Sequence, residues 1–308
     1  MNIQTTCPAC GISKKFPHVA IVQGDSNGDF NLYRCSRCGL LFVYPVPEIQ
    51  RHFHKELTGK PWPQESLKRA MEDYSRRVLK DSESCLFPGA RILDFGCGFG
   101  HFLAAAKEAG YYAEGVDISP GCRKHIAKYL PDVVVYPQLD DIPIDTEKYD
   151  LVMTFEVLYY MPYPRKLLCE LKSLLRPGGS IIVVVSANRG WLIWLLSRIK
   201  LAPVKLGEGD WMTSALLNGR AYYAFSIKSL IRLMESVGFT NLRTSRLQKP
   251  ATERLRYRIP LFIWWGCVCI LWVLSLGKVD LHTRAHVIGR YAPKDKAQGS
   301  PVEPAVRH

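Results

Sequence analysis

The sequence predicts an α/β protein with a mostly parallel sheet, and two observations indicate this class. Short apolar stretches, rich in β-branched residues, alternate with stretches of helical length, and they lie at residues 91–95, 113–117, 133–136, 149–156 and 180–185. Strands that alternate with helices in this way pair in parallel. The second observation is a glycine-rich turn after the first of these strands. The 308 residues, 47% of them hydrophobic, suffice for one large domain and a small additional one.

A helix through Ala104 to Gly110 is expected directly after the glycine turn, and two further helices are expected beside these strands. The first extends from Glu65 to about Ser84, because its apolar residues repeat with the 3.6-residue period of a helix; they are Leu67, Ala70, Met71, Tyr74, Val78 and Leu79. The second is rich in leucine and ends at the turn Arg176-Pro177-Gly178-Gly179, directly before the fifth strand.

The glycine turn indicates a ligand-binding loop. Gly96, Gly98 and Gly100 follow Asp94 and permit both a tight turn and close approach of a ligand to the backbone. A dinucleotide-binding G-x-G-x-x-G pattern would need a glycine where this chain has His101. About 20 residues after the loop, Asp117 ends the second strand, where an acid can accept hydrogen bonds from both ribose hydroxyls of a nucleoside.

The run from Arg91 to Val185 resembles the ubiquinone-biosynthesis-like group of class I S-adenosylmethionine-dependent methyltransferases. The resemblance rests on the G-x-G-x-G turn after an acid, the order of the elements and the Leu-Arg-Pro-Gly-Gly turn. Residues 225–230 and 235–239 look like that group's late helix and its entry to strand six, and residues 283–291 look like its final strand. The resemblance implies a Rossmann-like seven-stranded sheet, the cofactor S-adenosylmethionine, and a hydrophobic insert between the last two strands.

The resemblance also implies roles for individual residues. The residues Gly96, Gly98 and Gly100 would lie under the methionine part of the cofactor, with Asp94 just before them. Asp117 would hold the ribose, and Ile118 would pack on the adenine. The adenine edge would fall at Gln138, Leu139 and Asp140, where the usual acid aligns near Gln138; Asp140 or Asp141 is the substitute, and either is equally a solvated loop acid.

The chemistry places few demands on catalytic side chains. Methyl transfer from a sulfonium is an in-line displacement, so orientation and proximity supply much of the rate, and a base is needed only for a protonated acceptor. Many members of the group carry a histidine that faces the acceptor where this chain has Tyr160. The candidate catalytic residues are therefore Tyr160 and Glu156, with Tyr160 either orienting the acceptor or only packing.

The N-terminal segment predicts a zinc ribbon. Cys7 and Cys10 form one C-x-x-C-G unit, and Cys35 and Cys38 form a second. Two such units complete a tetrahedral four-sulfur site that suits a structural zinc ion, and about fifty residues need such an ion because they cannot build a sufficient core. Four unrelated structural cysteines are the alternative. The six remaining cysteines show no disulfide spacing, which fits a reducing compartment.

The domain layout follows from these assignments. We expect a zinc ribbon at 1–48, a linker and helical lead-in at 49–87, a methyltransferase domain at 88–293 and a disordered tail at 294–308. The domain would contain a substrate-side insert at 186–224 and an apolar, membrane-type insert at 250–281. Within the second insert, residues 259–276 carry no charged side chain, and an interfacial helix, a re-entrant hairpin, or a buried or dimer helix all fit this run.

Charge and hydropathy suggest the partners. Residues 186–308 carry 19 of the 41 lysines and arginines but only 7 of the 28 acids. The segments 190–200 and 254–278 combine basic residues with tryptophans, which indicates an anionic membrane surface and makes nucleic acid an unlikely partner. The N-terminus shows no secretory signal, so we expect a cytoplasmic protein, peripheral or monotopic at the inner membrane face.

Three functions are compatible with the sequence. The first is methyl transfer to a small-molecule acceptor (a sugar, nucleotide-sugar, lipid-linked glycan or quinone) at the cytoplasmic membrane face. The second is an RNA methyltransferase that uses the ribbon and the basic C-terminal region. The third is an inactive membrane-associated scaffold, which the intact glycine turn and Asp117 argue against. Oligomeric state and the methylated atom are not determined by the sequence.

Overall fold

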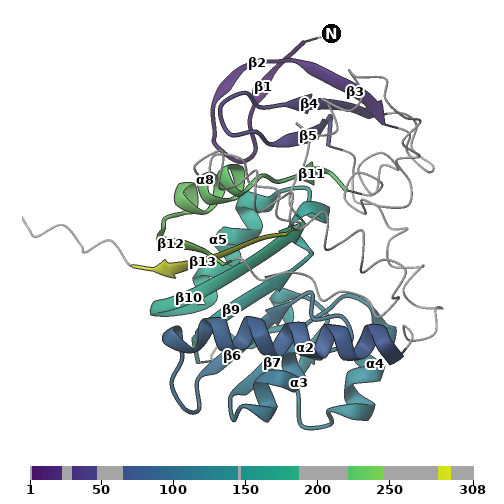
Figure 1. Ribbon diagram of the computed structural model, residues 1–308, viewed down its shortest axis with the longest axis vertical. Coiled ribbons are helices and arrows are strands. Elements are labelled where there is room, and N and C mark those ends of the chain that lie inside the picture. Colours follow the sequence, from purple (N-terminus) through teal and green to yellow (C-terminus); the bar gives the residue numbers. More distant parts are fainter. Residues whose placement is uncertain are drawn as a thin grey trace, which may run out of the picture.

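A computed structural model of the chain describes residues 2–22, 30–46, 65–144, 147–186, 221–245 and 284–292. A seven-stranded sheet in the order β12-β13-β10-β9-β6-β7-β8 forms its centre (Figure 1). The strands are β6 (Arg91–Phe95), β7 (Tyr112–Val116), β8 (Val135–Tyr136), β9 (Tyr149–Phe155), β10 (Leu175–Ser186), β12 (Phe239–Ser245) and β13 (Arg284–Tyr291). Neighbours from β10 to β8 pair in parallel, whereas β13 pairs antiparallel with β10 and β12. The expected seven-stranded Rossmann-like sheet is confirmed, in mixed form.

Helices cover both faces of this sheet. The helices and 3-10 turns are α2 (Glu65–Ser82), η1 (Glu83–Cys85), α3 (His101–Glu108), α4 (Pro120–Tyr129), η2 (Leu139–Asp141), η3 (Leu158–Tyr160), α5 (Pro164–Leu174) and α8 (Ile227–Val237). Alternate residues of strand β10 face opposite sides of the sheet and so belong to different cores, as the two-residue period of a strand requires. Ile182 and Val184 of β10 join the core with α2 and α3, while Val183 joins the core with α5 and α8.

Two element boundaries differ from the expectation for physical reasons. β10 begins at Leu175 rather than at Ser180, because Leu175 already pairs with Tyr149 of β9. The Pro-Gly-Gly segment then interrupts the pairing register between Leu175 and Ser180. The lead-in helix ends at Ser82, whose hydroxyl donates a hydrogen bond to the carbonyl of Val78 at 2.7 Å, and the chain continues as the turn η1.

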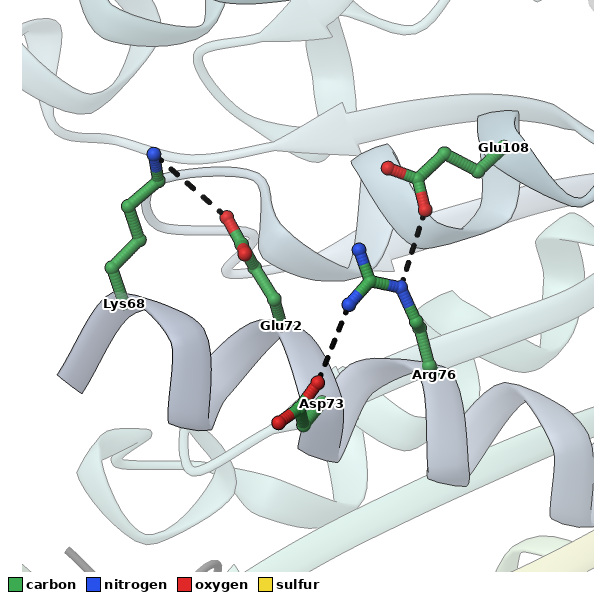
Figure 2. Close-up of polar contacts among 5 residues, drawn as sticks. All are labelled: Lys68, Glu72, Asp73, Arg76 and Glu108. Carbon is green, nitrogen blue, oxygen red and sulfur yellow. Dashed lines mark hydrogen bonds and ion pairs between the residues drawn. The ribbon is translucent and has the colours of Figure 1, made fainter. Parts of the chain in front are cut away.

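Charged side chains link α2 to α3 on their exposed sides (Figure 2). Arg76 Nε donates to Glu108 of α3 at 3.2 Å, and Arg76 Nη1 lies 3.4 Å from Asp73 one turn away. The hydrogen bond with Glu108 raises the pKa of Arg76. These pairs are largely solvated, so each adds at most about 1 kcal/mol. The two helices are therefore held mainly by their buried residues, such as Tyr74 and Phe102.

The N-terminal segment forms two small sheets above the large one (Figure 1). Their strands are β1 (Ile3–Thr6), β2 (Ser13–Phe16), β3 (His18–Val22), β4 (Phe30–Arg34), β5 (Leu41–Tyr44) and β11 (Tyr223–Ala224). β1 and β2 form a hairpin, and the second sheet has the order β11-β5-β4-β3. β11, at one edge of this second sheet, thus comes from a much later part of the chain than β3, β4 and β5. Its Tyr223 lies opposite Phe42 of β5. Buried residues of both sheets and of the α5–α8 side form one continuous core.

Several sequence-level expectations fall outside the described residues. Most of the two inserts, 186–224 and 250–281, and the tail at 294–308 lie outside them, as do the apolar stretches 190–200 and 254–278. In the part of the chain that the structure describes, no helix has both the length and the hydropathy to cross a bilayer.

Candidate active site

The glycine turn lies at the carboxyl end of β6 and is held by the next strand. The N–H of Gly96 donates to the carbonyl of Val116 at 2.7 Å, and the N–H of Gly98 donates to Asp117 Oδ2 at 2.8 Å. The other oxygen of this carboxylate, Asp117 Oδ1, accepts a hydrogen bond from the N–H of Ser119 at 2.8 Å. Asp117 therefore braces the turn from the end of β7, so the turn has its shape without a bound ligand.

The three glycines of the turn serve two different purposes. All have positive φ angles, 76° at Gly96, 54° at Gly98 and 80° at Gly100. A Cβ at Gly96 would overlap the side chain of Val157, and one at Gly100 would press on Ile126 at 3.0 Å. Among the described residues, a Cβ at Gly98 would meet no heavy atom within 4 Å. Gly98 is thus the position at which the backbone is open to a ligand, whereas the other two permit close packing.

Asp94 is a buried acid directly beneath the turn. Its side chain is 3% exposed, and its Oδ1 has no hydrogen-bond partner among the described residues. Burial, together with the nearby charge of Asp117, raises the pKa of Asp94 to about 8. A buried carboxyl that lacks a hydrogen-bond partner is stabilised by a cation or a hydrogen-bond donor, and the ammonium group of a bound amino acid can act as both.

The next strand end offers surfaces for a nucleoside. Ile118 follows Asp117 and is 56% exposed, although it is apolar. Gln138, Leu139 and Asp140 lie at the start of η2, after β8. The carboxylate of Asp141 accepts the N–H of Gln138 at 3.2 Å and closes this turn. Asp140 is exposed, so its carboxylate is the one available for the edge of an adenine.

The end of β9 brings the two candidate catalytic residues together. Glu156 has a φ of 58°, a conformation that is costly for a residue with a side chain, and its N–H donates to Val184 at 2.8 Å. Tyr159 donates its hydroxyl to Glu156 Oε2 at 2.7 Å, and burial raises the pKa of Tyr159 well above its usual value. The ring of Tyr160, half-buried, lies 4.4 Å from that of Tyr159.

Tyr159 and Val157 are site residues that the sequence analysis missed. Tyr159 orients Glu156, and Val157 fills the space that Gly96 leaves open. Only the adjacency of two tyrosines after an acid at a strand end hinted at Tyr159. Nothing in the sequence indicated that Val157 would contact a turn sixty residues away.

The four cysteines of the N-terminal segment converge on one point. Their sulfurs all lie within 4.8 Å of one another, with Cys7 and Cys38 at 3.7 Å and Cys10 and Cys35 at 3.7 Å. Four thiolates around a zinc ion at 2.3 Å would be about 3.8 Å apart, so this donor set fits the ion. The Cys38 thiol donates to the Cys7 sulfur and, with backbone N–H groups, lowers the pKa of Cys7 to about 5.

Fold and site together define a class of protein. The parallel strands place Gly98, the buried Asp94 and the exposed Ile118 together at the carboxyl ends of β6 and β7. These features fit the methionine part of S-adenosylmethionine, including its ammonium group, and the adenine. The molecule is a class I S-adenosylmethionine-dependent methyltransferase.

Comparison with known proteins supports this class. The family model described as "Methyltransferase domain" matches residues 62–244, which is more than half of the chain, and the chain belongs to this family.

Named relatives match over shorter lengths. The chain is 28% identical over 174 residues to the tRNA U34 carboxymethyltransferase of Saccharophagus degradans, covering 54% of this chain and 50% of the relative. It is 33% identical over 169 residues to the protein of the same name in Methylococcus capsulatus, covering 53% and 49%. The chain thus spans about half the length of these curated relatives.

A solved structure shares the fold. The complex between the Haloferax volcanii Trm112 methyltransferase activator and its methyltransferase matches with a TM-score of 0.50 and 16% identity, covering 80% of this chain and all of that one.

These relatives correct one of our expectations. We had judged nucleic acid an unlikely partner and an anionic membrane surface the expected one, and this judgement was wrong. It was based on the basic residues and tryptophans of 190–200 and 254–278, which are compatible with a membrane surface and with a nucleic acid. The matched relatives, in contrast, are named for a tRNA nucleotide.

Proposed function

We propose that this chain transfers a methyl group from S-adenosylmethionine to an RNA acceptor, and that tRNA is the first acceptor to test. The observation that carries methyl transfer is the open turn at Gly98, braced by Asp117. The RNA acceptor is supported by the tRNA modification for which the matched relatives are named. Because those matches cover about half of each relative, this acceptor is a proposal.

In this proposal, the glycine turn and side chains near the carboxyl ends of β6, β7 and β8 hold the cofactor. Gly98 and its neighbouring glycines approach the methionine part, Asp94 accepts its ammonium, and Asp117 keeps one lone pair on each oxygen for the ribose hydroxyls. Ile118 packs on the adenine, and Asp140 accepts its amino group, with Leu139 beside it. Asp141 takes no part, because its carboxylate closes the turn with Gln138.

The acceptor side begins where β9 ends. The cofactor supplies an activated methyl carbon, and the chain's own task is to position the acceptor in line with it. Glu156, held by the Tyr159 hydroxyl, can accept a hydrogen bond or a proton from the acceptor. Tyr160 offers a half-buried ring against which a base can stack.

We propose methyl rather than carboxymethyl transfer for this chain. A carboxymethyl donor carries an additional carboxylate close to the sulfonium, and this charge needs a cation nearby. The segments at the carboxyl ends of β6 and β9, residues 95–100 and 155–163, contain no lysine or arginine. They contribute Glu156 instead, which repels a second carboxylate.

We also propose that Cys7, Cys10, Cys35 and Cys38 bind one structural zinc ion. The support is their 3.7 Å sulfur separations and the matching knuckle turns, in which Gly11 and Gly39 donate to the carbonyls of Cys7 and Cys35. The domain layout stays as expected from the sequence, with a ribbon at 1–48 and a methyltransferase domain at 88–293, except that β11 completes the ribbon's sheet.

The deciding experiment is an acceptor survey with methyl-labelled S-adenosylmethionine. Bulk bacterial tRNA, ribosomal RNA and a small-molecule extract are each incubated with the protein, and with the Gly98→Val variant as the matched control. We expect label in RNA with wild-type protein only. Label confined to the small-molecule fraction would overturn the RNA acceptor. A parallel reaction with a carboxylated donor should give no product, and efficient carboxymethyl transfer would contradict the choice of donor.

A further inference from the structure

The strongest unassigned feature of the described residues is a groove between the ribbon and the start of α5. Its volume is about 820 Å³, within the range of pockets that bury a ligand of one or two rings. The residues that shape it, three from the ribbon and three from the segment before and at the start of α5, are Thr5, Thr6, Tyr44, Pro162, Tyr163 and Lys166. We call this feature the junction groove.

The wall of the junction groove is connected to the acceptor side by the chain and by two hydrogen bonds. The chain leaves Tyr160 at the end of η3 and reaches Pro162 two residues later. Tyr223 of β11 donates its hydroxyl to the carbonyl of Pro162 at 2.7 Å, and the N–H of Tyr222 donates to the carbonyl of Tyr159 at 2.9 Å. The groove wall and the acceptor residues are thus fixed to the same strand.

An exposed aromatic ring and an exposed lysine mark one wall of the groove. Tyr163 is 69% exposed, which is unusual for a ring this size in a concave surface. Lys166, one turn further on, has a side chain that is 76% exposed and lies 3.6 Å from Glu170. Such a solvated pair adds little energy, so the ammonium can exchange Glu170 for another anion. Arg165 is committed to the carbonyls of Ser236 and Ala9.

On the opposite wall, Thr5 of β1 pairs with Lys14 of β2, so one lysine of the ribbon neighbours the groove. A stacking ring beside an exposed lysine matches the chemistry of a single-stranded nucleic acid, which presents a flat base and a phosphate in each unit.

We propose that the junction groove binds the single-stranded RNA segment that flanks the methylated nucleotide, with one base stacked on Tyr163 and its phosphate at Lys166. This inference rests on the proposed RNA acceptor. It assigns to the ribbon a part in holding the substrate beside Tyr160.

The test measures RNA binding without cofactor. The probe is a fluorescein-labelled strand of ten uridines, followed by anisotropy at two salt concentrations. Tyr163→Ser should weaken binding about tenfold, since one stacked base contributes a factor of this order. Lys166→Ser should weaken it and reduce the salt slope by roughly 0.7, the value for one phosphate contact on a single strand.

Matched controls come from α4, far from the ribbon. Tyr129 is 60% exposed and Lys128 lies beside it, so Tyr129→Ser and Lys128→Ser make the same chemical changes on another surface. Both controls should bind the strand like wild type, and all four variants should bind S-adenosylmethionine normally by calorimetry.

The outcomes separate this inference from the proposed function. If wild-type protein methylates tRNA while Tyr163→Ser and Lys166→Ser bind and methylate like the controls, the groove assignment is wrong and the RNA acceptor stands. If wild-type protein neither binds the strand nor methylates any RNA, the proposed acceptor itself fails, and the groove assignment with it.

Discussion

At the scale of single residues, the site separates positions that serve packing from positions that serve the ligand. Gly96 and Gly98 are two residues apart, have similar φ angles and look equivalent in the sequence. Their surroundings differ, because Val157 occupies the space over Gly96, whereas no atom from the described part of the chain lies within 4 Å of a Cβ at Gly98. This difference allows the cofactor site to be tested without confusing loss of binding with loss of fold.

We expect Gly96→Ala and Gly98→Ala to fail in different ways. Gly96→Ala forces a methyl group into Val157 and should lower the free energy of unfolding by about 2 kcal/mol or more, from overpacking and the positive φ. Gly98→Ala should cost only the backbone strain of about 1 kcal/mol, yet weaken S-adenosylmethionine binding strongly. Denaturant unfolding and calorimetry on both variants check this; equal cofactor affinity in Gly98→Ala and wild type would refute the site.

Asp94 should make stability depend on pH. Its pKa is raised to about 8 in the folded protein, so between about pH 4 and pH 8 the unfolded chain releases a proton that the folded chain retains. The contribution of Asp94 to stability therefore falls as the pH rises through this window. Asp94→Asn should remove this slope and stabilise the cofactor-free protein at pH 8, while it weakens cofactor binding.

Urea unfolding at pH 5 and pH 8 measures this effect, with Asp140→Asn as a control at an exposed acid. If Asp94→Asn shows the same pH slope as wild type, the carboxyl is not protonated in the folded state and its assignment to the cofactor's ammonium loses its main support.

At the scale of elements, β11 connects the ribbon to the acceptor side. It pairs with β5 through Tyr223 and Phe42, and the residue before it bonds to η3. A further link joins Ser226, at the start of α8, to the carbonyl of Cys38, at 2.9 Å. The second cysteine knuckle therefore contacts the helix that follows β11, so we expect the state of the ribbon to affect the acceptor residues more than the cofactor cradle.

Loss of the metal should therefore impair methyl transfer more than cofactor binding. We expect one zinc ion per chain in wild-type protein and none in the double variant Cys7→Ser/Cys35→Ser, because four thiolates are needed to close the site. The variant should retain most of its S-adenosylmethionine affinity and lose most of its transfer rate. Elemental analysis, calorimetry and the labelled-methyl assay give the three values, and zinc content equal to wild type would disprove the ligand set.

The same elements show how far a sequence predicts such a site. The glycine turn, Asp117 and the two cysteine pairs were predictable, because each is a local pattern whose spacing reflects one strand-turn-helix or one knuckle. The pairing of β11 with β5 and the bond between Tyr159 and Glu156 depend on side chains and strands brought together by the whole fold. Two residues, Tyr223 and Ala224, are too short a strand for any periodicity to reveal.

At the scale of the whole molecule, the ribbon and the methyltransferase sheet share one buried core. Leu40 and Phe42 of the ribbon belong to the same cluster as Leu168 of α5 and Leu233 of α8. Two domains joined only by a linker would each have their own core. The contact explains why about fifty residues with few strands can hold a fixed position above the sheet.

We expect this shared core to produce a single cooperative unfolding transition. Differential scanning calorimetry should show one peak whose calorimetric and van't Hoff enthalpies agree. Chelation of the metal should move the whole peak to lower temperature rather than split off a small early transition. Two resolved peaks, with only the minor one sensitive to the chelator, would show that the ribbon unfolds independently.

The pairing of β11 with β5 also has a consequence for synthesis. Phe42 leaves the ribosome long before its partner Tyr223 is made, and at about 5–20 residues per second the delay is on the order of ten seconds or more. During that time the edge of β5 has no partner from its own chain, and an unpaired edge is open to other strands. A nascent chain that has already bound its metal would present that edge in fixed form, so the ribbon is the part of this protein for which protection by a chaperone during translation matters most.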